Sequence, residues 1–214
     1  MVRDPLPQPK SSAAPAPGEL PDVIRAFRQR RRTTAPSPRC DFCADELPNQ
    51  HQHVLDTRTR RLYCACRACY LLFTSDGAGA GHLRAVPDRL RAVPDTDLAR
   101  IMAEAICGPV QLGFAFVSTS RDAIVTCYPN PHGVAESTLP PESTVAVALR
   151  TLLIADVEAV LCWRHAEDVS VYLAPIDVCY ELVGRLRTVT RGRDLERTLM
   201  AFFDDLRTRI QGSS

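Results

Sequence analysis

Cys40-Asp-Phe-Cys43 and Cys64-Ala-Cys66-Arg-Ala-Cys69 are the two stretches that decide the fold of the N-terminal part of this chain. They contain two Cys-x₂-Cys pairs, and residues 44–65 separate the pairs. A Cys-x₂-Cys turn, or knuckle, lets both thiolates reach one metal ion from the same side, and two such turns supply the four ligands that Zn²⁺ prefers. The spacing therefore predicts a tetrahedral metal site made of Cys40, Cys43, Cys66 and Cys69.

The segment between the two pairs is typical of a β-hairpin. His53-Val-Leu-Asp56 and Arg61-Leu-Tyr-Cys64 are strand-like runs on either side of Thr57-Arg-Thr59. After Cys69, the run that starts at Tyr70 predicts the start of a helix. A knuckle, a hairpin and a second pair that opens a helix is the order of a treble-clef zinc finger, and a rubredoxin-like arrangement of two knuckles fits nearly as well. We expect a small metal-binding module over residues 40–76.

Three further residues are alternative or additional ligands. Cys64 and Cys66 are two positions apart on a predicted strand, so both side chains could face the metal and Cys64 could pair with Cys69 instead. His51 and His53 could also bind, because imidazole is a good zinc ligand. Otherwise we expect the two histidines to be exposed hairpin residues and Cys64 to be a packed thiol beside the site.

The cysteine pattern leaves the metal open between zinc and iron. Four thiolates also bind a single iron or an iron–sulfur cluster, and an additional cysteine suits a cluster as well as it suits zinc. We expect zinc, because the knuckles lack the Gly and Pro residues that usually let rubredoxin backbones donate to the sulfurs. Unligated thiols and disulfides are less expected, given the paired spacing and a reducing compartment.

Charge and composition limit the classes of partner. The 26 basic and 25 acidic residues leave a net charge of +1, which favours neither nucleic acid nor an anionic membrane. Residues 1–39 form a basic segment rich in Pro, Ala and Ser, which we expect to be disordered or partly helical. The arginines of Arg28–Arg32 could contact phosphates, so nucleic-acid binding is possible but not favoured. No apolar signal core follows Met1, and Val145–Leu161 is too charged to span a bilayer, so we expect a cytoplasmic protein.

The rest of the chain predicts a compact α+β domain. Residues 77–94 contain glycines and prolines and are expected to be a linker, followed by the domain over residues 95–211. Helices and strands are partly segregated along it, which favours α+β over a doubly wound parallel sheet. The expected helices are Asp97–Ile106, Thr144–Ile154, one N-capped by Asp177, and one over Leu195–Ile210; the expected strands are Gln111–Ser118, Ala123–Tyr128, Val157–Trp163 and Val169–Ile176. A turn is expected at Tyr128–Gly133.

This domain carries no recognisable catalytic motif. There is no phosphate-binding loop, nucleophile elbow or zinc-protease motif, so no reaction can be named and a non-enzymatic role is expected. Asp156 and Glu158 could act as an acid–base pair, but we expect them to be solvated at the start of a strand. His132 lies in a turn without an identifiable partner, and His165 is expected at the surface. The four isolated cysteines are expected to be buried as small hydrophobes: Cys107, Cys127, Cys162 and Cys179.

The chain also resembles a known family in the stretch from Cys40 to Phe73 and in Tyr128–Gly133, Asp156–Leu161 and Pro175–Gly184. It is similar to an uncharacterised actinobacterial family encoded beside [NiFe]-hydrogenase genes, with an N-terminal four-cysteine metal finger. The resemblance runs from about residue 40 to the final helix. It implies an accessory protein of hydrogenase assembly or function, and hydrogenase subunits or maturation factors as partners.

These observations predict a metal-binding accessory protein that acts through protein–protein contacts. In this interpretation zinc is structural, because it folds a segment too short to have its own core. An iron-containing electron-transfer protein and a zinc-finger nucleic-acid binder are the alternatives.

Overall fold

A computed structural model of the chain describes residues 37–75, 77–93, 96–108, 110–130, 133–165, 168–189 and 192–212. Contacts within the chain divide it into two units, Met1–Ser37 and Pro38–Ser214, and every element below belongs to the second. Residues 1–36 of the basic N-terminal segment, which we expected to be disordered or partly helical, lie outside the described residues, and so do the arginines of Arg28–Arg32. Among the helices described, none combines the length and the hydropathy that crossing a membrane requires.

Six strands form one antiparallel sheet, the large sheet, and its central strands are the most apolar part of the sequence. Every residue of β5 is buried, as expected for a strand covered on both faces. The strands follow one another across the sheet in this order: β4 (Arg91–Ala92), β9 (Asp168–Pro175), β8 (Glu158–His165), β5 (Leu112–Ser118), β6 (Ala123–Asn130) and β7 (Gly133–Thr138).

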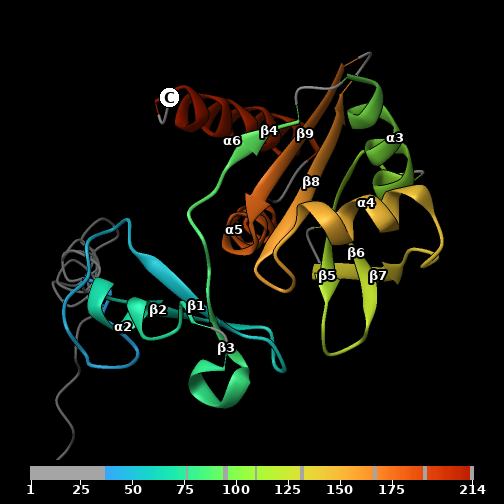
Figure 1. The fold of residues 1–214 in the computed structure, drawn as a ribbon. Helices are drawn as coiled ribbons and strands as arrows, with labels where there is room; N and C mark the ends of the chain where they lie inside the picture. The colour runs from blue at the N-terminus through green and yellow to red at the C-terminus, as the bar shows by residue number, and fades with distance from the viewer. Residues whose placement is uncertain are drawn as a thin grey trace, which may run out of the picture. The chain divides into compact units, whose positions relative to one another are not determined.

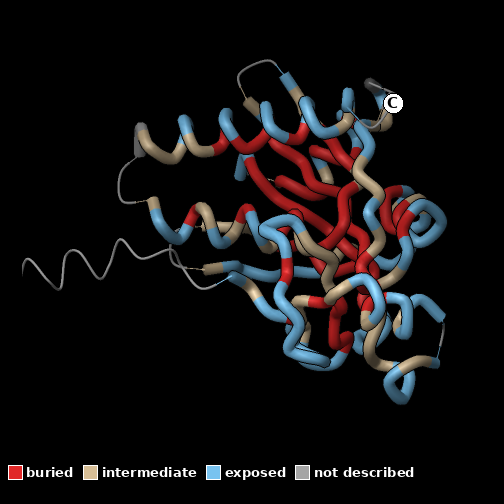
Figure 2. Tube along the Cα trace, turned by 90° about the vertical axis from the view of Figure 1, so that its left-hand side faces the viewer, coloured by how far each residue is buried: buried red, intermediate tan, exposed pale blue. Residues whose placement is uncertain are grey.

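Helices cover both faces of the large sheet (Figure 1). Because side chains alternate along a strand, Phe114 and Phe116 of β5 pack on one face and Ala115 and Val117 pack on the other. The first face is covered by α5 (Ile176–Arg187) and α6 (Gly192–Gly212), and the second by α3 (Thr96–Cys107) and α4 (Thr144–Leu152). Figure 2 shows the buried residues concentrated between these layers.

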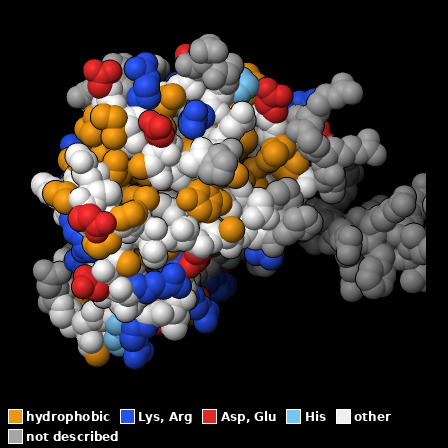
Figure 3. All heavy atoms as spheres, turned by 90° about the vertical axis from the view of Figure 1, so that its right-hand side faces the viewer, with side chains coloured by type: hydrophobic (Ala, Val, Ile, Leu, Met, Phe, Trp, Pro, Cys, Tyr) orange, Lys and Arg blue, Asp and Glu red, His pale blue; other side chains and the backbone are white. Residues whose placement is uncertain are grey.

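The outer surface of α3 and α4 keeps some apolar side chains. Figure 3 shows hydrophobic side chains gathered on this face. Ile101 of α3 and Val147 of α4 are each about half exposed.

A second, smaller sheet carries the cysteines. It has the order β2-β1-β3, and α2 (Arg67–Leu71) and the short 3₁₀ helix η1 (Ala78–Gly81) accompany it. Its strands are β1 (Gln52–Asp56), β2 (Arg61–Ala65) and β3 (Leu83–Ala85). We call residues 38–86 the cysteine module. One face of its sheet packs on α2 through a small core of Val54, Ala65 and Tyr70.

The other face of the small sheet packs against the large sheet's α5 and α6 side. Leu55 and Val86 belong to the same buried cluster as Leu182 of α5 and Phe203 of α6. Arg60, in the hairpin turn, binds Glu136 of β7 with both terminal nitrogens, at 2.8 and 2.7 Å. The cysteine module and the large sheet therefore share part of one hydrophobic core.

The architecture agrees with the α+β prediction, and the hairpin of β1 and β2 lies where it was predicted. Three details differ from the expectations. The stretch 77–94 contains β3 and β4, one strand in each sheet. At the expected turn Tyr128–Gly133, residues 128–130 are instead the last residues of β6, and Gly133 begins an additional edge strand, β7, which the sequence pattern did not predict. Asp177 lies in the first turn of α5 rather than at its N-cap, which is Pro175.

Candidate metal centre

The first knuckle is a tight turn that closes on itself. The N–H of Ala44 donates to the carbonyl of Cys40 at 2.8 Å, and the N–H of Cys40 donates to the carbonyl of Asp45 at 2.8 Å. Ala44 adopts a left-handed backbone conformation with φ of 66°, which reverses the chain direction. In this turn Cys40 is buried and Cys43 is exposed.

Asp41 fastens the first knuckle to the hairpin. Its backbone N–H donates to the carbonyl of Cys64 at 2.8 Å, and its carboxylate accepts from the N–H of Cys64 at 2.6 Å. These two bonds hold residues far apart in the sequence side by side at the end of β2. Cys66 follows two residues later, so this attachment brings the second cysteine pair to the first.

The second pair lies at the start of α2. Cys66 is the N-cap residue of this helix, with an extended backbone conformation, and its carbonyl accepts from the N–H of Tyr70 at 2.9 Å. Cys69 lies within the helix one turn later. The Cys66–Cys69 spacing across a helix start points both thiols toward the first knuckle.

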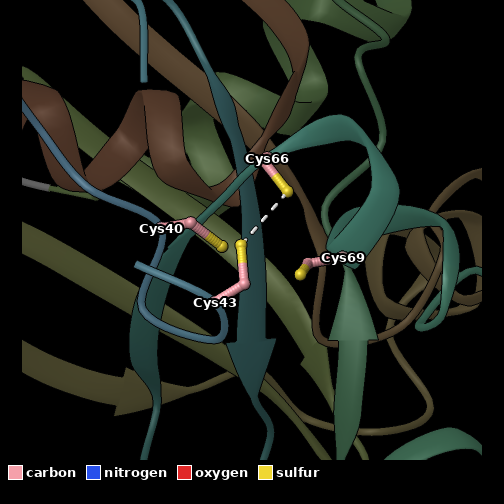
Figure 4. Close-up of side chains that lie close together, drawn as sticks. All are labelled: Cys40, Cys43, Cys66 and Cys69. Atoms are coloured by element: carbon pink, nitrogen blue, oxygen red, sulfur yellow. Dashed lines mark hydrogen bonds between the residues drawn. The ribbon is translucent and has the colours of Figure 1, made fainter. Parts of the chain in front are cut away.

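The four sulfurs converge on one point. Figure 4 shows the side chains of Cys40, Cys43, Cys66 and Cys69 directed toward one another, and their sulfurs lie within 4.8 Å of one another. The sulfurs of Cys43 and Cys66 are 3.7 Å apart. A tetrahedral site with metal–sulfur bonds of about 2.3 Å has sulfurs about 3.8 Å apart, whereas a disulfide bond is about 2.05 Å long. The cysteines are free thiols, and the group could hold a metal ion.

The electrostatics of the four thiols favour a bound cation. Burial acts to raise the pKa of Cys40, but backbone N–H groups, first that of Cys66, outweigh it and lower the pKa to about 6. The pKa of Cys43 is raised. The N–H of Asp45 acts to lower this pKa, but the Cys40 sulfur and burial, which act to raise it, outweigh that hydrogen bond together with smaller contributions. Burial, and then the sulfurs of Cys66 and Cys40, raise the pKa of Cys69, while Cys43 acts to lower it. A thiolate at Cys40 thus disfavours ionisation of Cys43 and Cys69, and a metal cation would offset this repulsion.

The three other candidate ligands form a separate group. His51, His53 and Cys64 each place a ligand atom within 4.8 Å of the other two. Cys64 does not join Cys66 because β2 ends at Ala65 and Cys66 belongs to the helix start, so the strand alternation does not extend between them. Burial raises the pKa of Cys64, and the charges of Asp41 and Cys40 add to the shift.

The carboxylates that the sequence offered as an acid–base pair are buried and used by the fold. The expectation that Asp156 and Glu158 are solvated is wrong, since their exposed fractions are 4% and 1%. Asp156 accepts from the N–H of Thr119 at 2.9 Å and from its hydroxyl at 2.6 Å. Glu158 accepts from the N–H of Ile154 at 2.7 Å and pairs with Arg89. Both carboxylates fasten loops to the large sheet.

The remaining candidates agree with their sequence-based interpretation where they are described. Cys107, Cys127, Cys162 and Cys179 are buried, as predicted. His165 is partly exposed and stacks on Trp163, with ring centroids 4.9 Å apart. His132 lies outside the described residues.

Sequence reasoning missed two residues that position the candidate ligands. Asp41 lies inside the first Cys-x₂-Cys pair, and an acidic residue there could have signalled a bond to the second strand. The carboxylate of Asp177 accepts from His53 Nδ1 at 2.8 Å across 124 residues of sequence. No pattern in the neighbouring sequence predicts that contact.

Comparison with known proteins gives one match. The sequence model of the family described as "Family of unknown function (DUF5947)" matches residues 39–210. No curated protein and no solved structure matches the chain. The match begins just before Cys40 and ends in α6, so it includes both groups of candidate ligands.

Proposed function

The chain belongs to the DUF5947 family, a family of unknown function, and we propose that it is a metal-binding accessory protein that acts through protein–protein contacts. In this proposal Cys40, Cys43, Cys66 and Cys69 hold one structural Zn²⁺. The observation that carries it is the convergence of four free thiols from two separate segments. Four sulfur ligands at tetrahedral spacing suit Zn²⁺ and leave no position for a substrate.

The small size of the module's own core supports a structural role for the metal. Three buried residues, Val54, Ala65 and Tyr70, make up the core between α2 and the small sheet. So small a core contributes little stability, and small domains commonly add a metal for this reason. We propose a treble-clef class for the module, since its order of knuckle, hairpin and helix is the treble-clef order.

Exposed apolar residues beside the cysteines support a protein-binding role. Leu71 and Leu72, at the end of α2, expose 49% and 68% of their surface, and Phe42 inside the first knuckle exposes 37%. The ring of Phe42 contacts that of Phe73, with centroids 4.8 Å apart, which links the knuckle to the end of α2. A cluster of exposed apolar side chains on a folded module is a common mark of a protein interface.

The resemblance noted in the sequence supplies the partner that we propose. The resemblance implies a role in [NiFe]-hydrogenase assembly or function. We propose that a hydrogenase subunit or a maturation factor binds to the surface made by Phe42, Leu71 and Leu72. A cytoplasmic location belongs to the same proposal, because a reducing compartment keeps the nine cysteines available as thiols.

An iron site for electron transfer is the second candidate. Backbone N–H groups act on the Cys40 sulfur, and hydrogen bonds to sulfur are one means by which proteins set the reduction potential of an iron–sulfur centre. Zinc and iron differ in colour, because Zn²⁺ has a filled d shell.

Elemental analysis with an absorption spectrum tests the metal proposal. Protein purified without oxygen and without a histidine tag is compared with the Cys43→Ser/Cys66→Ser variant. We expect the variant to lose one equivalent of zinc and neither sample to absorb visible light. Visible charge-transfer bands that the variant lacks would establish iron instead, and an unchanged metal content would overturn the four-cysteine site.

A binding assay tests the protein-contact proposal separately. The double variant Leu71→Glu/Leu72→Glu should lose at least 10-fold in affinity for an immobilised [NiFe]-hydrogenase large subunit or maturation factor, because charge is introduced into the proposed contact (about 1.4 kcal/mol or more). Ile101→Glu on α3 is the matched control, since it changes an equally exposed apolar residue away from the module. Equal binding by both variants would contradict the proposed surface.

A further inference from the structure

His51, His53 and Cys64 lie on one face of the β1–β2 hairpin. In the register of the hairpin, His53 is directly opposite Cys64. His51 lies just before the start of β1 and beside His53. The imidazole centroids of the two histidines are 4.9 Å apart, and one ligand atom of each of the three residues lies within 4.8 Å of the other two.

The two imidazoles are held in a specific orientation by acceptors. His51 Nδ1 lies 2.9 Å from the carbonyl oxygen of Pro48, and His53 Nδ1 lies 2.8 Å from a carboxylate oxygen of Asp177. Both partners only accept hydrogen bonds, so Nδ1 carries the proton and the lone pair of the neutral ring is on Nε2. Histidines that bind metals through Nε2 are oriented in this way by a carbonyl or a carboxylate.

One of these lone pairs is left without a partner. Nε2 of His51 is buried, and no described group lies within hydrogen-bonding distance of it. A buried polar atom without a partner is costly, and an unplaced ion or water is a usual explanation. The Cys64 side chain, opposite His53, is half-buried and has no place in the four-cysteine group.

We propose that His51, His53 and Cys64 form a second metal site, with Asp177 as the positioning residue for His53. The site takes a borderline divalent transition metal such as Zn²⁺, because imidazole and thiolate ligands favour these ions over Mg²⁺ and Ca²⁺. Cys64 loses its proton when the metal binds, and the two histidines bind in their neutral form.

Three protein ligands leave a fourth position for water or a small ligand. This donor set differs from the closed set of four sulfurs and is the type found in open zinc sites. The site stands independently of the proposed structural zinc, since the two groups share no residue. It also joins β1 to α5, because Asp177 belongs to that helix.

Counting bound metal tests this proposal. Tag-free protein is loaded with Zn²⁺, freed of loosely bound ion and analysed for zinc per chain. We expect about two equivalents for the unchanged chain and about one for each of His51→Ala, His53→Ala and Cys64→Ser. His82→Ala is the control, because His82 is a partly exposed histidine of the module that belongs to neither group. The retained equivalent in the four-cysteine site shows that each variant still folds.

Titration of the metal-free protein with Co²⁺ gives an independent readout. We expect two sets of thiolate-to-cobalt bands, one lost in Cys64→Ser and the other in Cys43→Ser/Cys66→Ser. Asp177→Asn should weaken only the Cys64-dependent phase, by about 10–100-fold. A purely structural role for the His53–Asp177 contact would leave that phase unchanged.

The outcomes separate this proposal from the four-cysteine zinc. A single equivalent that survives His53→Ala and Cys64→Ser would overturn the second site and leave the first. A single equivalent that survives Cys43→Ser/Cys66→Ser and disappears in Cys64→Ser would support the second site and overturn the first.

Discussion

Asp56 shows how single residues of the hairpin set its turn. It is the last residue of β1, and its buried carboxylate accepts from the N–H groups of Arg58 at 2.9 Å and Thr59 at 3.2 Å. Its backbone carbonyl accepts from Arg60, which has a left-handed φ of 59°. An aspartate that binds the N–H groups of the next residues is a common means of starting a turn.

The charge of Asp56 makes this turn sensitive to acid. Burial acts to raise its pKa, but the N–H groups of Arg58 and Thr59 outweigh burial, and the pKa is lowered. A carboxylate with a lowered pKa in the folded state stabilises the protein above its unfolded pKa of about 3.9, and this contribution is lost as the pH falls through the folded value.

Asp56→Asn should therefore lower the free energy of unfolding at pH 7 by roughly 1–3 kcal/mol, measured by urea denaturation. The difference from the unchanged chain should begin to shrink below about pH 4, where the carboxylate of the unfolded chain takes up a proton, and should disappear only below the lowered pKa of the folded state. Asp204→Asn, an exposed position on α6, should have little effect at either pH. A difference that stays constant down to pH 3 would show that the charge of Asp56 is not responsible.

At the scale of elements, the cysteine site depends on how three pieces meet. The first knuckle, the end of β2 and the start of α2 each contribute part of it. No single helix or strand contains all three pieces. Asp41 makes the connection through its two bonds to the backbone of Cys64. The affinity for metal should depend on this attachment as well as on the four sulfurs.

Asp41→Ala keeps all four thiols but removes the carboxylate that holds the first knuckle against β2. We expect zinc affinity to fall by about 10–100-fold, as is usual when a group that orients the ligands is lost. Competition with a coloured chelator measures the change. Glu46→Ala removes an exposed ion pair with Arg39 in the same segment and should leave the affinity nearly unchanged. Equal affinities for both variants would argue that the knuckle needs no such attachment.

At the scale of the whole molecule, the module and the large sheet are coupled by a shared core. Leu55 is almost fully buried in the cluster that also contains Trp163, Phe202 and Phe203. The Trp163 ring stacks on Phe203, with centroids 4.7 Å apart. Trp163 is the one tryptophan of the chain, so its fluorescence reports on the core of the large sheet.

Removing metal with a chelator should consequently lower the temperature at which Trp163 fluorescence reports unfolding. Leu55→Ala should lower the free energy of unfolding by about 2–5 kcal/mol. It should also reduce the effect of the chelator on this temperature, because the variant weakens the contact between the module and the large sheet. Leu149→Ala is the matched control: Leu149 is equally buried but lies in the cluster on the opposite face of the sheet. Leu149→Ala should lower the free energy of unfolding by a similar amount, and the chelator should still lower the unfolding temperature of this variant by its full amount. The same loss of effect in both variants would contradict a specific role for Leu55.

Much of this molecule follows from patterns that are local in the sequence. The two cysteine pairs, the hairpin between them, the central strands and most helices were predicted because spacing and hydrophobic period act over a few residues. The grouping of Cys40 and Cys43 with Cys66 and Cys69 was likewise predicted, since the chemistry of a knuckle requires neighbouring thiols. The exposed edge strand β7 was missed because its polar residues carry no such period.

Other features were decided only by the tertiary structure. The end of β2 and the start of α2 separate Cys64 from Cys66, and Cys64 lies with His51 and His53 instead. The buried carboxylates of Asp156 and Glu158 have their partners, Thr119 and Arg89, in other segments of the chain. The partner of His53 lies 124 residues away. Such contacts have no period along the chain, because they arise when the hydrophobic faces of distant elements pack together and bring unrelated side chains within hydrogen-bonding distance.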